Sequence, residues 1–126
     1  MSLEGDLSRC RFAGEAIVSK DETPFLKRQT LWPRQDFVVL RLESHAITPL
    51  FKQIMAAGLS RSIIHVQIER SGVLELRAYD NFGAGCVMTG PNVSEALLSE
   101  LQSERVLRAF TAAAGDAERA SADSTS

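Results

Sequence analysis

Three short segments of alternating apolar and polar residues constrain the fold of this chain more than any other feature. Two of them, residues 62–69 and 73–80, show the period of two that places successive side chains on opposite faces of a strand. Ser71 and Gly72 lie between them and favour a tight reversal of the chain. A shorter segment, residues 85–89, follows a second turn. The sequence therefore predicts a three-stranded antiparallel meander with one face open to solvent.

Further strands and helices are predicted on either side of this meander. A strand at 36–43 is apolar on both faces, which is typical of a central strand, and a weaker strand is predicted at 11–19. Helices are predicted at 48–58, where Thr-Pro begins the segment and Gly ends it, and at 93–110. We therefore expect an α+β protein: an antiparallel sheet, in the order β–β–α–β–β–β–α, with helices packed on one face.

The length of 126 residues, with 44% hydrophobic residues, fits one globular domain. We predict that this domain covers residues 1–114. Residues 20–36, hereafter the connection, form a long irregular segment within it, with two prolines and little periodicity. Residues 115–126 contain no large apolar side chain, so we expect them to form a disordered tail.

Charge and cysteine content limit the partners and the compartment. The chain has 14 Lys and Arg against 16 Asp and Glu, a formal net charge of −2, so direct binding to nucleic acid is not expected. Its apolar runs are too short to span a membrane, and residues 1–11 do not resemble a secretory signal. Cys10 and Cys86 are expected to be reduced thiols, which favours the cytoplasm or the nucleus.

No group of residues has the pattern of a catalytic or metal site. The two histidines, His45 and His65, fall on different predicted elements, and no cysteine pair has metal-ligand spacing, so no metal or cofactor is expected. Cys86 and His65 are predicted on opposite strand faces, which does not suit a nucleophile and its base. The glycines at 83 and 85 precede a strand, whereas a phosphate-binding loop precedes a helix. The sequence therefore does not favour an enzyme.

A surface that mixes cationic, polar and aromatic side chains is the strongest candidate for a functional site. The hairpin face and the connection together supply it, and this composition suits contact with a protein partner or self-association. The residues of this predicted surface are His65, Gln67, Arg77, Tyr79, Lys27, Arg28 and Trp32. Phe25, Leu31 and Trp32 are expected to pin the connection to the body of the protein.

Three segments share the spacing of a known family: residues 42–55 (LESHAITPLFKQIM), 63–80 (IIHVQIERSGVLELRAYD) and 85–88 (GCVM). Together they resemble the first half of a domain of the DNA sliding clamps (proliferating-cell-nuclear-antigen-like), including the checkpoint clamp subunits. The resemblance covers about 50 of the 126 residues and implies a related topology. A longin- or roadblock-like scaffold has a similar order of elements.

These observations favour a small non-enzymatic protein-interaction module, either a subunit or an adaptor of a larger complex. Two alternatives stay open. The resemblance implies an accessory protein of DNA replication or repair with clamp-like topology. The hairpin face, with Tyr79, Asp80, His65 and Arg77, is alternatively a site for a small molecule or for catalysis.

Overall fold

The computed structural model describes residues 1–56, 62–105 and 109–111 of the chain. The chain divides into two compact units, the first being Met1–Asn92 and the second beginning at Val93. No helix in these described ranges is long and apolar enough to cross a lipid bilayer.

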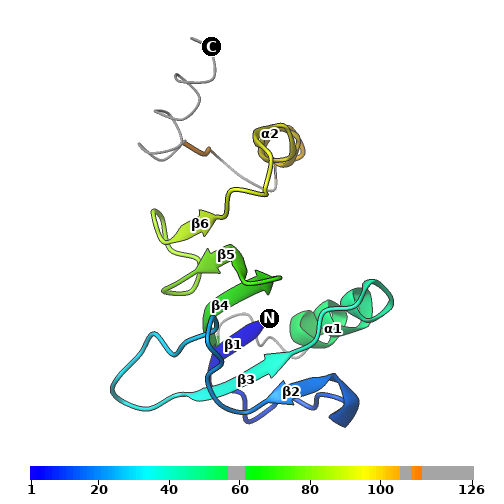
Figure 1. Ribbon diagram of the computed structural model, residues 1–126, viewed down its shortest axis with the longest axis vertical. Helices are drawn as coiled ribbons and strands as arrows, with labels where there is room; N and C mark the ends of the chain where they lie inside the picture. Colours follow the sequence, from blue (N-terminus) through cyan, green and yellow to red (C-terminus); the bar gives the residue numbers. More distant parts are fainter. Residues whose placement is uncertain (57–61, 106–108, 112–126) are drawn as a thin grey trace. The chain divides into compact units, whose positions relative to one another are not determined.

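Six strands within the described residues form one antiparallel sheet in the spatial order β2-β3-β1-β4-β5-β6 (Figure 1). The strands are β1 (Ser2–Gly5), β2 (Ile17–Ser19), β3 (Asp36–Leu40), β4 (Ile63–Arg70), β5 (Val73–Ala78) and β6 (Val87–Thr89). The helices are α1 (Ser44–Ala56) in the first unit and α2 (Glu95–Ser103) in the second, and a 3-10 turn occupies Gly14–Ala16. The α+β class and the antiparallel sheet are therefore confirmed, with one additional strand at the start.

The predicted meander is present as β4, β5 and β6. Arg70 pairs with Val73, so only Ser71 and Gly72 lie in the turn between β4 and β5. Both turn residues have positive φ, 52° and 81°, which is the backbone of a tight hairpin with the twist of its strands. The sequence identifies this turn because glycine adopts that conformation without steric cost.

The strand β1 was not predicted, although it lies in the middle of the sheet. Leu3 pairs with Val38 of β3 on one side and with Val66 of β4 on the other. All four residues of the strand are buried. Gly5 has a φ of 151°, and a Cβ there would lie 2.1 Å from the carbonyl oxygen of Ser62. The close approach of the two backbones at this point therefore requires glycine. The sequence Ser-Leu-Glu-Gly is too short and too polar for a periodic signal.

Three other boundaries differ from the prediction. The predicted strand at 11–19 is strand only in β2, since a 3-10 turn precedes it. The strand at 36–43 is shorter, ending at Leu40, but it is buried on both faces as expected. The helix α1 begins at Ser44 instead of Thr48, so Pro49 lies inside it. The first turn forms before the proline because Ile47 N donates to Glu43 O at 3.1 Å.

The helix α2 is shorter than the predicted segment. Ser94 caps its N-terminus, accepting a hydrogen bond from Leu97 N at 3.1 Å. The chain leaves the helix well before Phe110, since Arg105 has a φ of 63°. The packing of α2 on the sheet and the single domain over residues 1–114 stay predictions. The predicted tail, residues 115–126, lies outside the described residues.

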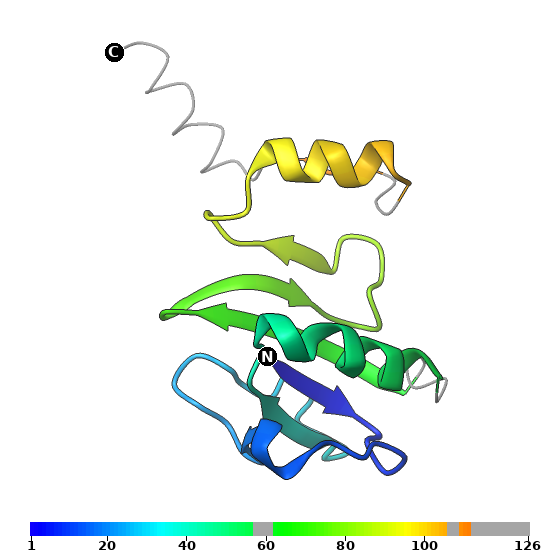
Figure 2. The same cartoon turned by 90° about the vertical axis from the view of Figure 1, so that its right-hand side faces the viewer.

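The two faces of the sheet have different covers. On one face, where α1 lies (Figure 2), the core is apolar and Leu50 of the helix packs against it. The buried members of this cluster are Met1, Leu3, Val38, Leu40, Ile63, Val66 and Ala78. The connection covers the other face, where the buried side chains include polar and charged ones.

Candidate interaction site on the connection

The connection is anchored to the sheet by one apolar side chain. Thr23 and Leu26 close a turn, in which Thr23 N donates to Leu26 O at 3.0 Å and Leu26 N donates to Thr23 Oγ1 at 3.0 Å. This turn, favoured by the proline at position 24, places Leu26 against Phe37 and Val39 of β3. Leu26 is 3% exposed, so the predicted irregular segment has its own small core.

A buried carboxylate fixes the middle of the connection. Glu4 of β1 is 1% exposed and accepts hydrogen bonds from Gln29 N at 2.7 Å and from Thr30 N at 3.2 Å. A carboxylate out of water is costly unless donors replace its hydration, and these two backbone amides do so. The central strand therefore determines where residues 29 and 30 lie.

Gln67 of β4 fixes the connection at a second point. Its Oε1 accepts from Lys27 N at 2.9 Å and from Ser2 Oγ at 3.3 Å. Its Nε2 donates to the phenolic oxygen of Tyr79 at 3.0 Å. The amide thus joins β1, β4 and the residue that follows β5 to the connection, and it is 2% exposed.

His65 provides a third point of attachment. Its Nδ1 accepts a hydrogen bond from Asp80 N at 3.2 Å, and its Nε2 lies 2.8 Å from Thr30 Oγ1. Because a backbone amide can only donate, Nδ1 carries no proton, so the hydrogen of the neutral ring is on Nε2 and is donated to Thr30. Tyr79 packs edge-on against the ring at 5.6 Å. His65 therefore has a structural role, because its two ring nitrogens link Thr30 of the connection to Asp80.

The prediction that His65 and Gln67 project from an open face is wrong. Both side chains are buried beneath the connection, at 6% and 2% exposure. Arg77 and Tyr79 are partly buried, whereas Lys27 and Trp32 are exposed. Alternation of polar residues usually indicates a solvated face, but a segment without periodicity covers this one. Glu4, His65 and Gln67 therefore form a buried polar layer beneath the connection, and Tyr79 packs at its side.

The tip of the connection, Leu31-Trp32-Pro33, projects into solvent. Leu31 is 93% exposed and Trp32 is 85% exposed, so the expectation that they pin the connection is wrong. Both flanks of the tip are nevertheless tied down. Thr30 is bound by Glu4 on one side, and on the other Gln35 O accepts from Arg28 Nη1 at 2.6 Å, directly before β3 begins.

Arg28 contacts residues that precede and follow the tip in the chain. Its guanidinium lies 5.0 Å from the ring centroid of Phe37, donates from Nη1 to Gln35 O at 2.6 Å and has Asp21 at 3.9 Å. The side chain is 13% exposed. Its Nε is buried and has no hydrogen-bond partner among the described residues.

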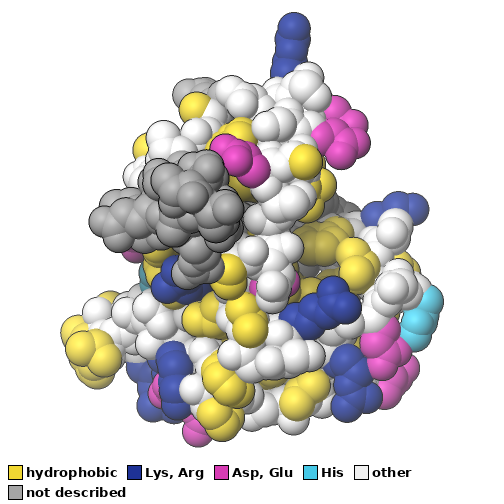
Figure 3. Space-filling model, turned by 45° about the horizontal axis from the view of Figure 1, so that its top comes forward, with side chains coloured by type: hydrophobic (Ala, Val, Ile, Leu, Met, Phe, Trp, Pro, Cys, Tyr) yellow, Lys and Arg dark blue, Asp and Glu magenta, His cyan; other side chains and the backbone are white. Residues whose placement is uncertain are grey.

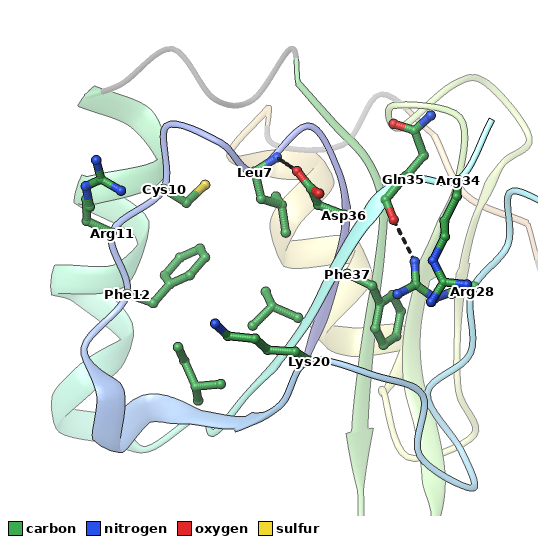
Figure 4. A pocket seen from close by; sticks show the side chains of 12 residues that line it. Leu7, Cys10, Arg11, Phe12, Lys20, Arg28, Arg34, Gln35, Asp36 and Phe37 are labelled. Carbon is green, nitrogen blue, oxygen red and sulfur yellow. Dashed lines mark hydrogen bonds between the residues drawn. The ribbon is translucent and has the colours of Figure 1, made fainter. Parts of the chain in front are cut away.

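Two hollows adjoin this segment, and Arg28 and Arg34 line both. The first, of about 620 Å³, lies between β3, β2 and residues 7–12 (Figure 4). Burial raises the pKa of the Cys10 thiol in its wall, and the charges of Asp6 and Asp36 raise it further. The second hollow, of about 450 Å³, is bordered by the tip.

Side chains of different kinds are interspersed over the face drawn in Figure 3, where cationic, acidic and hydrophobic groups alternate. Cys10 and Cys86 are free thiols. Among the residues that the structure describes, no group of three or more His, Cys, Asp and Glu side chains is placed to hold a metal ion.

Comparison with protein-family models, with curated proteins and with solved structures finds no match to this chain.

Proposed function

We propose that this protein is a non-enzymatic interaction module that binds a protein partner through the tip of the connection. The observation that carries the proposal is the exposure of Leu31 and Trp32, at 93% and 85%, on a segment held by Glu4 on one side and by Arg28 at Gln35 on the other. Tryptophan is enriched among the residues that contribute most to binding at protein interfaces.

The anchoring of the tip supports this function as much as its exposure. Glu4, Gln67 and His65 hold residues 27–30 by four hydrogen bonds from the body of the sheet. A segment that is already ordered loses less conformational entropy on binding, so more of the contact energy appears as affinity. The buried polar layer thus presents two large apolar side chains in one defined place.

The experiment compares the full chain with a double variant of the tip, Leu31→Ser with Trp32→Ser. Each is used as bait for affinity purification, followed by mass spectrometry and reconstitution with the purified partner. Phe82→Ser is the matched control, because Phe82 is 54% exposed and belongs to a different turn. Circular dichroism verifies that all variants fold.

We expect one stoichiometric partner that the Phe82 variant retains and the tip variant loses. Loss of one hot-spot aromatic side chain typically weakens an interface by at least ~2 kcal/mol, about thirtyfold in dissociation constant. A partner that binds the folded tip variant as tightly as the wild type contradicts the proposal.

The cytoplasm or the nucleus is the compartment in which we place this function. The resemblance of residues 42–89 to sliding clamps favours a partner from DNA replication or repair, contacted as a protein. Because the formal net charge is −2, we expect direct binding to duplex DNA to be weak at ~0.15 M salt. Tight DNA binding by the purified chain under that condition contradicts this assignment.

A further inference from the structure

The larger hollow exists because β2 is short. β2 pairs with β3 only at Val39 and Leu40, and the chain then leaves the sheet at Lys20. The outer side of Asp36–Val38 is therefore not covered by a strand and forms part of the hollow instead. Figure 4 shows residues 7–12 facing this stretch from across the opening.

The hollow has an apolar wall. The side chains that contribute to it are Leu7, Cys10, Phe12, Ile17, Phe37 and Val38. Its volume of about 620 Å³ lies within the ~300–1,000 Å³ range of small-molecule sites. Apolar surface of this extent favours a ligand that carries an aliphatic chain or a ring.

Cations surround this apolar wall. Four of them, Arg11, Lys20, Arg28 and Arg34, line the hollow together with a single carboxylate, Asp36. Asp36 is already engaged, because its Oδ2 accepts from Leu7 N at 3.0 Å. Figure 4 shows the Lys20 side chain extending across the hollow, and Arg28 and Arg34 close to each other beyond Phe37.

Three of these cations have no partner charge among the residues that the structure describes. The ion pairs of the described residues include Arg28 with Asp21, but none involves Arg11, Lys20 or Arg34. Like charges that share one hollow repel each other, and an anion between them relieves that repulsion.

We propose that this hollow binds a small organic anion, with its aliphatic or aromatic body on the apolar wall and its carboxylate or phosphate among the cations that line it. This site does not depend on the proposed function, although Arg28 and Arg34 also line the smaller hollow beside the tip. Arginine and lysine form charge-assisted hydrogen bonds with both kinds of head group.

The test uses Cys10 as a reporter and Cys86 as an internal reference. Cys10 lines the hollow, whereas Cys86 does not. The full chain is alkylated with the uncharged reagent N-ethylmaleimide, and the rate at each cysteine is followed by peptide mass spectrometry. The probes are octanoate and octyl phosphate, with 1-octanol as the neutral body and inorganic phosphate as the head group alone.

The variant that tests the cations is Lys20→Gln with Arg34→Gln. Neither side chain makes a hydrogen bond or ion pair within the part of the chain that the structure describes, so the fold is expected to persist. Lys52→Gln is the matched control, because Lys52 is an exposed cation of α1 outside the hollow.

We expect both amphipathic anions to slow alkylation of Cys10 but not of Cys86, and octanol and phosphate to have little effect. The double variant should weaken this protection by about tenfold or more, and the Lys52 variant should not change it. The anion that protects Cys10 at the lower concentration identifies the preferred head group. Equal protection by octanol, equal protection of the double variant, or no binding down to about 1 mM affinity overturns the proposal.

Discussion

The two faces of the sheet are held by different kinds of interaction. On the face beneath α1, residues such as Leu3 and Leu40 are buried among apolar neighbours. On the face beneath the connection, Glu4, His65 and Gln67 are buried and each hydrogen-bonds the connection. The first kind of contact depends on the area removed from water, whereas the second depends on the position of each donor and acceptor.

These two kinds of contact have different roles, one in the stability of the domain and the other in the position of the connection. Apolar burial contributes most of the free energy of folding but tolerates small shifts of its members. A buried carboxylate with two amide donors tolerates only one arrangement of residues 29 and 30. We therefore infer that the α1 face stabilises the domain and that the polar layer determines where the tip lies.

Shortening Leu3 on the apolar face should have the largest effect. Leu3 is 2% exposed in the central strand, so Leu3→Ala should lower the free energy of unfolding by ~2–5 kcal/mol. Urea denaturation followed by circular dichroism measures this loss. Val18→Ala, at a position 52% exposed, should change it by less than ~0.5 kcal/mol. Similar losses in the two variants would contradict the assignment of Leu3 to the core.

Glu4→Gln should have an intermediate effect and should act on the connection. An amide offers one acceptor oxygen and turns its NH2 group towards the other backbone donor, at a cost of ~1–3 kcal/mol. Hydrogen exchange should accelerate at the amides of Gln29 and Thr30 but much less at Leu40. Glu15→Gln, at an exposed position, is the control. Uniform acceleration over the sheet would mean that the polar layer stabilises the whole domain and not the connection alone.

Thr30→Val should have a smaller effect, because it removes only the hydroxyl that accepts from His65 Nε2. We expect a loss of ~0.5–1.5 kcal/mol in unfolding free energy. Nitrogen NMR of the imidazole should show that the Nε2–H tautomer loses its hydrogen bond. Thr89→Val, on the exposed strand β6, provides the comparison. An unchanged imidazole spectrum would contradict the hydrogen bond between His65 and Thr30.

The smallest effect is expected for the reactivity of Cys10, which packs against the apolar core. Because burial and then the charges of Asp6 and Asp36 raise the pKa of its thiol, less thiolate is present at pH 8 than in the unfolded chain. Alkylation of Cys10 should therefore be slower in the folded protein, and its rate should continue to rise above pH 9. Asp6→Asn should accelerate it. A folded rate equal to the unfolded rate would contradict this prediction.

The sequence predicts elements whose pattern is local and fails where an element depends on its surroundings. The hairpin turn at Ser71-Gly72 and the buried strand β3 have strong local signals, and both are confirmed. The strand β1 has no such signal, since its burial results from neighbours distant in the chain. Alternating polar residues in β4 indicate solvent only if nothing covers them, and no local pattern shows where an irregular connection lies.

The candidate site follows the same rule. The composition of the connection identifies Lys27, Arg28 and Trp32 as interaction residues, and the structure shows Trp32 exposed. The larger hollow could not be predicted, because its lining comes from four separate stretches of the chain. Its one sequence signal is the pair of arginines at positions 9 and 11, because the cations of the connection are nearly balanced by its acids.

The position of β1 also has a consequence for assembly on the ribosome. Among the described strands, β3 and β4 are not neighbours, so β2–β3 joins β4–β5–β6 only through β1. A nascent chain can close the β4–β5 hairpin locally, but β1 can complete the sheet only after both of its partners have been synthesised. Until β4 is paired with β1, its free edge stays open to strands from other molecules. We therefore expect aggregation during synthesis to depend on how quickly the first residues find their place.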